Sequence, residues 1–287
     1  MKLFGMLLLV LVAFAGNSVL NRLALVGDGA IGALEFATVR VIAGAITLVI
    51  LVRLRDRHLE RERRLPTRGE LSAAGALTLY LLGFSFAYLT LPAGLGALIL
   101  FGGVQITMFA GAVLGGENVP RARWLGATMA FGGLIYLLWP TGAEAPDPIG
   151  ALLMGAAAVG WGIYSLLGRG SKDPLSDTSR NFLYATLPVG AALMVMGAGG
   201  VAPDVPLRGV LLGIASGAIT SGLGYALWFR VLPTLAPSTA AVAQLTVPLI
   251  AMAGGMVFLA EPLTLRFVIA SAIVLGGVGY AVLAPKS

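Results

Sequence analysis

The side chains that could bind a small molecule in this sequence are amides and aromatic rings placed inside long apolar stretches. Lipid cannot satisfy an embedded amide, so Gln105 and Gln244 indicate either a cavity or a bond between helices. Tyr80, Phe84 and Tyr88 recur at every fourth position and therefore share one face of a helix. Such groups suit a ligand with a polar head and an apolar body. The candidates for ligand contact are Asn17, Tyr80, Phe84, Tyr88, Phe101, Gln105, Trp161, Tyr164, Ser165, Tyr225 and Gln244.

Each candidate also has an ordinary structural explanation. Serine hydroxyls such as that of Ser165 usually bond the backbone of their own helix, and midspan amides often bond between helices. The hydroxyls left out of the candidate set for this reason are those of Ser216, Thr220 and Ser221. Trp161 and Tyr164 lie well inside a stretch, so a cavity and simple packing are equal alternatives. Tryptophans at the ends of stretches are more typical of an aromatic belt; these are Trp124, Trp139 and Trp228.

Charged residues within the apolar stretches are few. Arg40 could hold a substrate carboxylate, or it could brace backbone carbonyls and Glu35, and we favour bracing. Glu117 and Glu261 follow two corresponding stretches, where we expect them to fix short connections through helix N-termini, with gating as the minor alternative. Proline is tolerated at a helix start. The structural or gating candidates are Glu35, Arg40, Glu117, Glu261, Pro92 and Pro233.

Several chemistries lack the residues that they need. The sequence has no cysteine, its one histidine is His58 in a basic segment, and it contains no Gly-rich motif ending in Gly-Lys-Ser/Thr. Thiolate metal sites, cysteine nucleophiles and ATP-driven transport are therefore not supported. We expect no catalytic residue, no metal and no cofactor, and hence no enzyme.

The composition is that of an integral membrane protein. Hydrophobic residues make up 58% of the 287 residues and charged residues only 11%, against about 25% charged in soluble proteins. Continuous apolar runs near 20 residues predict transmembrane helices rather than barrel strands. The ten predicted spans are Leu3–Leu20, Ile31–Val52, Leu71–Leu91, Ala93–Gly116, Trp124–Trp139, Ile149–Gly168, Phe182–Ala198, Leu207–Phe229, Ala236–Leu259 and Phe267–Ala284.

The two halves of the chain resemble each other at an offset of 144 residues. Met108, Gly111, Glu117, Gly132, Gly133 and Tyr136 recur as Met252, Gly255, Glu261, Gly276, Gly277 and Tyr280. Each half has an odd number of spans, so the halves enter the bilayer in opposite orientations, as in many secondary transporters. We therefore predict two inverted five-helix repeats, residues 1–140 and 149–287, joined by the outer loop Pro140–Pro148.

Basic residues set the predicted orientation. With both termini in the cytoplasm, all but four of the 19 Lys and Arg residues fall on the inner side; the four are Arg22, Arg40, Arg208 and Arg266. The net charge of +6 is thus explained by topology, and we expect no nucleic-acid partner.

These features resemble the drug/metabolite transporter superfamily, EamA type. The residues that carry the resemblance are Leu-Gly-Gly-Glu at 114–117 with Gly132-Gly133, Leu-Ala-Glu-Pro-Leu-Thr at 259–264 with Gly276-Gly277, and Arg40. The resemblance covers nearly the whole chain and is nearest to the YddG-type branch that exports aromatic amino acids. It implies a multi-pass protein of the bacterial inner membrane that exports small metabolites.

Two function classes follow. The first is an alternating-access carrier that exports aromatic or other neutral amino acids from a cavity bordered by the first, third, fourth, sixth, eighth and ninth spans. The second is a non-transporting scaffold or a lipid-handling protein of the same fold. Because Glu35 is the only acid within a span and lies toward its outer end, we expect transport uncoupled from protons. The expected partners are a small zwitterion and membrane lipids, with a monomer as the working state.

Overall fold

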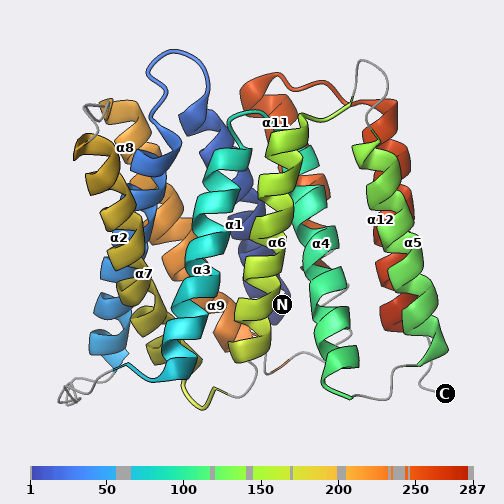
Figure 1. Ribbon diagram of the computed structural model, residues 1–287, viewed down its shortest axis with the longest axis horizontal. Helices are drawn as coiled ribbons and strands as arrows, with labels where there is room; N and C mark the ends of the chain where they lie inside the picture. The colour runs from blue at the N-terminus through green and yellow to red at the C-terminus, as the bar shows by residue number, and fades with distance from the viewer. Residues whose placement is uncertain are drawn as a thin grey trace.

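The computed structural model describes residues 2–55, 66–116, 120–139, 145–168, 171–198, 205–231, 234, 243–244 and 246–283. Within these ranges the regular structure is entirely helical (Figure 1). The elements are α1 (Lys2–Leu25), α2 (Ala33–Arg55), α3 (Arg68–Ala87), α4 (Ala93–Leu114), α5 (Arg121–Leu138), α6 (Pro148–Gly168), α7 (Pro174–Ala198), α8 (Leu207–Ile214), the π-helix η1 (Ala215–Leu223), α9 (Gly224–Val231), α11 (Val247–Leu259) and α12 (Leu265–Leu283). Three of these elements, α8, η1 and α9, follow one another without a break. Together they form one continuous helical rod.

The protein is a multi-pass membrane protein. Among the described residues, seven helical segments are long and apolar enough to cross a bilayer: α1 to α4, α6, α7, and the rod over Leu207–Trp228. The apolar segments Val247–Leu259 and Leu265–Ala281 are shorter. The helix α5 begins with Arg121 and Arg123, which lower its hydropathy. The count of ten spans therefore stays a prediction.

Some helix boundaries differ from the predicted ones. The helix α7 begins at Pro174, eight positions before the predicted Phe182, because ion pairs and hydrogen bonds stabilise its polar first turns. The predicted start of the ninth span, Ala236, lies outside the described residues, and α11 is described from Val247. Pro92 is the N-cap of α4, as expected from the sequence. Pro233 and Glu117 also lie outside the described residues.

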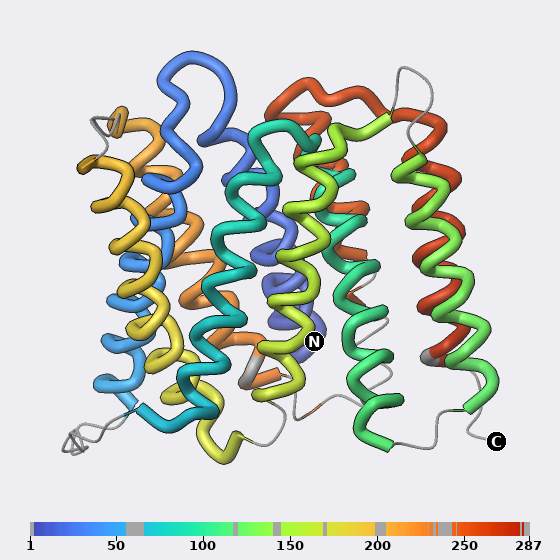
Figure 2. Tube along the Cα trace, in the orientation of Figure 1, coloured from blue at the N-terminus to red at the C-terminus, as the bar shows by residue number. Residues whose placement is uncertain are grey.

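The helices stand side by side, and successive helices run in opposite directions (Figure 2). The pair α5–α12 forms one edge of the molecule, α2, α7 and α8 lie at the other edge, and α1, α3, α4 and α6 lie between them (Figure 1). The start of α1 and the end of α12 both lie toward the lower part of the view (Figure 2).

Helix pairs contact each other in a regular scheme: α5 with α12, α2 with α7, α4 with α11, α3 with α6, α1 with η1 and α9, α4 with α6, α1 with α11, α2 with η1, and α3 with α7. Glycines allow several of these contacts. A Cβ at Gly277 would lie 2.8 Å from the carbonyl oxygen of Gly126, so α5 and α12 touch backbone to backbone. Close approach of this kind is how helices associate in lipid, where no hydrophobic force drives them together.

Candidate functional site

Three buried polar side chains meet in the centre of the helix bundle. Asn17 of α1 is 4% exposed, Arg40 of α2 is 0% exposed and Tyr80 of α3 is 4% exposed. The Tyr80 hydroxyl oxygen accepts a hydrogen bond from Arg40 Nη2 at 2.9 Å and faces Asn17 Nδ2 at 3.4 Å. Asn17 and Arg40 precede Tyr80 by 63 and 40 residues in the sequence, and both contact its hydroxyl group.

The segment η1 closes this cluster from the second half of the chain. Asn17 Oδ1 accepts hydrogen bonds from Ser216 Oγ at 2.6 Å and Thr220 Oγ1 at 3.0 Å. Ser221 Oγ accepts from Arg40 Nε at 3.3 Å. We call Asn17, Arg40, Tyr80, Ser216, Thr220 and Ser221 the central cluster. Its members belong to both halves of the chain.

The guanidinium group of Arg40 is an unusual group to find in a membrane interior. Its guanidinium carbon lies 5.2 Å from the Tyr80 ring centroid and 4.9 Å from that of Phe84, within cation–π range. Its Nη1 is buried and has no hydrogen-bond partner among the residues that the structure describes. Arg40 was expected to brace carbonyls and Glu35. Among the described residues its hydrogen bonds instead go to the hydroxyls of Ser221 and Tyr80, and the Glu35 carboxylate lies against Gly32 at the start of its own helix. A buried donor without a partner costs free energy, which an anionic ligand would offset.

Aromatic rings line one side of the central cluster. The Trp161 ring centroid lies 4.9 Å from that of Tyr80, 5.1 Å from that of Tyr225 and 5.5 Å from that of Tyr164. The position of α6 depends on Gly160, where a Cβ would lie 2.8 Å from the backbone nitrogen of Tyr80. We call Tyr80, Phe84, Trp161, Tyr164 and Tyr225 the aromatic wall. A wall of this kind suits an apolar or aromatic side chain of a ligand.

Two further candidates bond backbone groups rather than face the central cluster. Phe84 packs edge to face on Tyr88 with 4.8 Å between centroids, and the Tyr88 hydroxyl donates to the carbonyl of Ala93 at 3.3 Å. The Ser165 hydroxyl donates to the carbonyl of Trp161 at 2.7 Å, one turn back in its own helix. The ordinary explanation for hydroxyls in membrane helices therefore fits Ser165.

Within the described ranges, no hydrogen bond or ring contact joins Phe101, Gln105 or Gln244 to the central cluster. Phe101 is buried in the apolar core. The two amides are half-buried, and neither makes a hydrogen bond with another residue in the described part of the chain. The expected participation of the fourth and ninth spans in the cavity thus rests on sequence alone.

The tryptophans divide between the membrane belt and the interior. Trp124 and Trp139 are 52% and 57% exposed, which is compatible with a belt position. The belt expectation is wrong for Trp228, which is only 8% exposed. Its ring packs against Phe14, and Phe14 in turn contacts Tyr225. Trp228 lies at the end of its predicted span, which suggested the membrane interface. Aromatic packing between α1 and α9 buries it instead.

A second polar group lies where α1 ends and α4 begins, at helix ends that are uppermost in Figure 1. Arg22 of α1 donates to the carbonyls of Tyr88 at 2.8 Å and Leu89 at 2.7 Å, and its Nε lies 3.6 Å from Glu261 Oε1. The Glu261 carboxylate accepts from the backbone N–H of Ala93 at the first turn of α4. Burial raises the pKa of Glu261, while the Ala93 N–H and Arg22 oppose that rise. We call this set the Arg22–Glu261 cluster.

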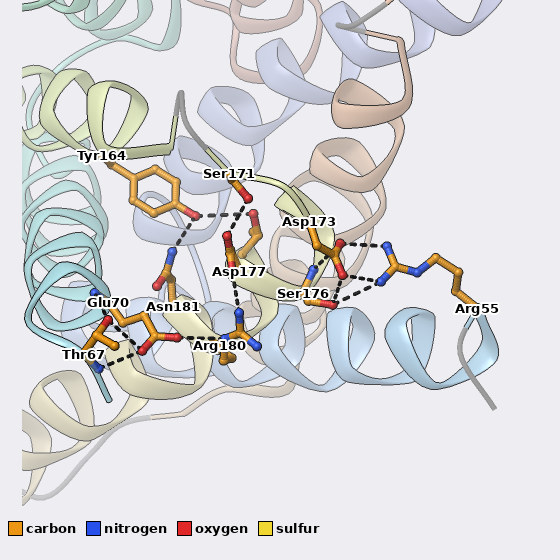
Figure 3. A network of polar contacts seen from close by, with 11 residues as sticks. Arg55, Thr67, Glu70, Tyr164, Ser171, Asp173, Ser176, Asp177, Arg180 and Asn181 are labelled. Atoms are coloured by element: carbon orange, nitrogen blue, oxygen red, sulfur yellow. Dashed lines mark hydrogen bonds and ion pairs between the residues drawn. The ribbon is translucent and has the colours of Figure 1, made fainter. Parts of the chain in front are cut away.

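A third polar group lies where α2 ends and α3 and α7 begin, at helix ends that are lowest in Figure 1, and its side chains are drawn in Figure 3. Arg55 donates to both carboxylate oxygens of Asp173, at 2.8 and 2.5 Å. Arg180 Nε lies 3.0 Å from a carboxylate oxygen of Glu70, and Arg180 also pairs with Asp177. The hydrogen bonds from Arg55 hold the pKa of Asp173 well below its usual range. We call this set the Arg55–Asp173 cluster.

Comparison with known proteins decides the family. An uncharacterized protein of Pseudomonas aeruginosa is 44% identical over 278 residues, which cover 97% of this chain and 93% of the relative. The model of the EamA-like transporter family matches residues 148–283. The chain belongs to the EamA-like transporter family.

Two further proteins are similar to this chain. A protein of Archaeoglobus fulgidus described as an uncharacterized transporter is 26% identical over 256 residues, covering 87% of this chain and 86% of the relative. A protein of known crystal structure superposes with a TM-score of 0.66 at 22% identity and covers 96% of this chain and 98% of its own. The last likeness concerns the fold alone.

Sequence reasoning missed several residues of these clusters. Ser216, Thr220 and Ser221 were set aside as hydroxyls that bond their own helix. Thr220 does bond the carbonyl of Ser216, but all three hydroxyls also contact Asn17 or Arg40. Arg22 appeared only as one of four basic residues outside the inner side. That isolation was itself a signal, because a lone cation on the poorly charged side of a membrane protein needs a partner.

Proposed function

We propose that this protein exports aromatic or other neutral amino acids, and related small metabolites, across the inner membrane by alternating access. The observation that carries the proposal is Arg40 Nη1, a buried cationic donor without a hydrogen-bond partner in the described ranges. A substrate carboxylate matches this donor in charge and geometry. The aromatic wall beside it supplies an apolar surface for the substrate side chain.

The helix pairing supports two inverted repeats over residues 1–140 and 149–287. We exchange α1 to α5 with α6, α7, the rod, α11 and α12, in that order. Each of the helix pairs named under the overall fold then finds its counterpart. The contact of α3 with α6 becomes that of the rod with α1, and the contact of α4 with α6 becomes that of α11 with α1. A two-fold relation of this kind underlies the rocking of transporter halves about a central site.

Alternating access requires that the halves separate at one end at a time. The Arg55–Asp173 cluster joins α2 and α3 to α7 at one end, and the Arg22–Glu261 cluster joins α1 and α4 to the residues after α11 at the other. Each cluster therefore links the halves across the end that must open. Charged helix ends such as Arg53, Arg55 and Arg68 support a cytoplasmic lower end and cytoplasmic termini.

Counterflow in proteoliposomes with labelled amino acids tests the proposal. The wild type should exchange neutral amino acids, and Arg40→Gln should lose most of that exchange because a carboxylate would lack its cationic partner. Arg53→Gln is the matched control, since Arg53 is exposed at the end of the same helix. Equal exchange in wild type and Arg40→Gln would contradict the assignment of Arg40 to the substrate.

One observation favours a second candidate, a lipid-handling protein. A groove of about 390 Å³ lies between α4, α5 and α6, and its lining is mostly apolar. Ile106, Phe131, Ile135 and Val159 are among the lining residues. Transfer of labelled phospholipid between leaflets, without amino-acid exchange in the same vesicles, would favour this candidate. If neither lipid transfer nor amino-acid exchange is detected, the remaining alternative is a non-transporting scaffold.

A further inference from the structure

The rod from Leu207 to Val231 changes its winding in the middle. Eight residues of α-helix lead into nine residues of π-helix, η1, and then into eight more of α-helix. A π-helix pairs backbone groups five residues apart, is rare, and occurs frequently at functional sites. The segment η1 packs against α1 and α2, which carry Asn17 and Arg40.

The π winding decides which side chains face the central cluster. Ser216 and Ser221 are five residues apart, both are fully buried, and they contact Asn17 and Arg40 respectively. In an α-helix, residues five apart point in directions that differ by about 140°. In a π-helix they lie a little more than one turn apart and point in more nearly the same direction. The π register of η1 therefore brings Ser221 toward the side of the rod that carries Ser216, so that one rod contacts both Asn17 and Arg40.

A glycine brings η1 close to Arg40. A Cβ at Gly217 would overlap the carbonyl oxygen of Arg40 and would lie 2.9 Å from the Cβ of Ala43. The backbone of η1 thus lies directly against the backbone of α2 at the arginine. This contact places Ser221 within reach of Arg40 Nε.

The guanidinium group is planar, so two bonded nitrogens fix the direction of the third. Ser221 holds Nε and Tyr80 holds Nη2, and Nη1 is the donor left over. We infer that Ser221, held in place by the π register of η1, is a positioning residue that aims Arg40 Nη1 at the substrate carboxylate. The inference rests on the proposed function, in which Arg40 binds that carboxylate.

Selectivity for the carboxylate tests the positioning role. In proteoliposomes loaded with labelled phenylalanine, competition by phenylalanine is compared with competition by phenylalaninamide, which lacks the carboxylate. Ser221→Ala should lower the preference for phenylalanine about tenfold, the usual effect of one hydrogen bond to a charged group. Thr38→Ala is the matched control, because the Thr38 hydroxyl bonds the carbonyl of Leu34 in its own helix. A purely structural role would lower both competitions together and leave their ratio unchanged.

Deletion of Gly222 tests the register. Removal of one residue lets the rod wind as an α-helix and turns Ser221 away from Arg40, so the same loss of preference is expected. Ser221→Ala removes only a hydroxyl and decides the question by itself even where the deletion variant does not fold.

A double-mutant cycle separates the inference from the proposed function. Thermal midpoints in detergent of Arg40→Gln, Ser221→Ala and the double variant should be non-additive, because the two side chains are bonded. Additive midpoints, or an unchanged preference in Ser221→Ala, would overturn the positioning role. A wild type that exchanges neither compound, combined with non-additive midpoints, would refute the proposed function and support the Arg40–Ser221 coupling.

Discussion

Trp161 stacks on Tyr80 with 4.9 Å between ring centroids, and the residue just before it, Gly160, touches the backbone of Tyr80. The same close helix contact therefore places both the aromatic wall and the hydroxyl that Arg40 bonds. Small changes at Gly160 should act on both together.

Gly160→Ala should push α6 away from α3. The added Cβ would lie 2.7 Å from the carbonyl oxygen of Ala76 and 2.8 Å from the Tyr80 nitrogen, so the helices must shift. Overpacking of this kind costs about 1–3 kcal/mol, and we expect a lower thermal midpoint with a changed Trp161 fluorescence. Gly155→Ala is the control on the same helix, since nothing lies within 4 Å of its added Cβ. Equal midpoints for the two variants would contradict the tight contact.

Glu261 should make stability depend on pH in a predictable direction. Because burial raises its pKa, the folded protein binds this proton more tightly than the unfolded chain. Stability should therefore fall as pH rises from the ordinary carboxyl pKa through the raised one. Glu261→Gln cannot ionise, so the difference between wild-type and variant thermal midpoints should shrink toward acid pH and widen toward neutral pH, in favour of the variant. A constant difference between pH 4 and pH 7, measured in detergent, would argue against a raised pKa.

Linking Arg55 to Asp173 should stop transport if the lower end must open. The chain has no cysteine, so Arg55→Cys with Asp173→Cys supplies the only two thiols. A short cleavable cross-linker between them should arrest amino-acid exchange, and cleavage should restore it. The single variant Asp173→Cys treated in the same way is the control. Full exchange by the cross-linked protein would show that this end does not separate.

Proton coupling can be excluded or found with a pH gradient. In proteoliposomes with equal substrate on both sides, we expect no net movement, because the described membrane helices place no acid in the central cluster. Glu35 is buried but lies in the first turn of α2, away from that cluster. Uphill accumulation that is lost in Glu35→Gln would overturn the uncoupled mechanism.

Much of the helical framework could be predicted from sequence because its cause is local. The four-residue spacing of Tyr80, Phe84 and Tyr88 predicts a shared face, and the three rings do contact one another in turn. Pro92 marks a helix start because its missing N–H needs no partner there. The boundary of α7 was missed because its first turns are polar and are held by residues of other helices.

The central cluster could be predicted only in part because its contacts are not local. Asn17 was a candidate by type, but its partners lie 63 and 199 residues away. Arg40 was expected to brace its surroundings, and hydropathy cannot indicate that two ring faces and two hydroxyls would surround it. The winding of η1 leaves no periodic trace in a segment that is apolar and rich in small residues.

The backbone contact between α5 and α12 has a mechanical consequence. This edge pair consists of one helix from each half. The backbones of Gly126 and Gly277 lie directly against each other, with only the Cβ atoms of Met129 and Ala281 beside them. Surfaces without interposed side chains have little that can slide or repack, so we expect this pair to act as a stationary pivot. At the opposite edge α2 also has a backbone contact, with η1 at Gly217, but it meets α7 through a side chain, the ring of Phe182 wedged against Gly44. A bulky ring in a glycine notch can leave and return, so displacement during the transport cycle should be greater between α2 and α7 than between α5 and α12.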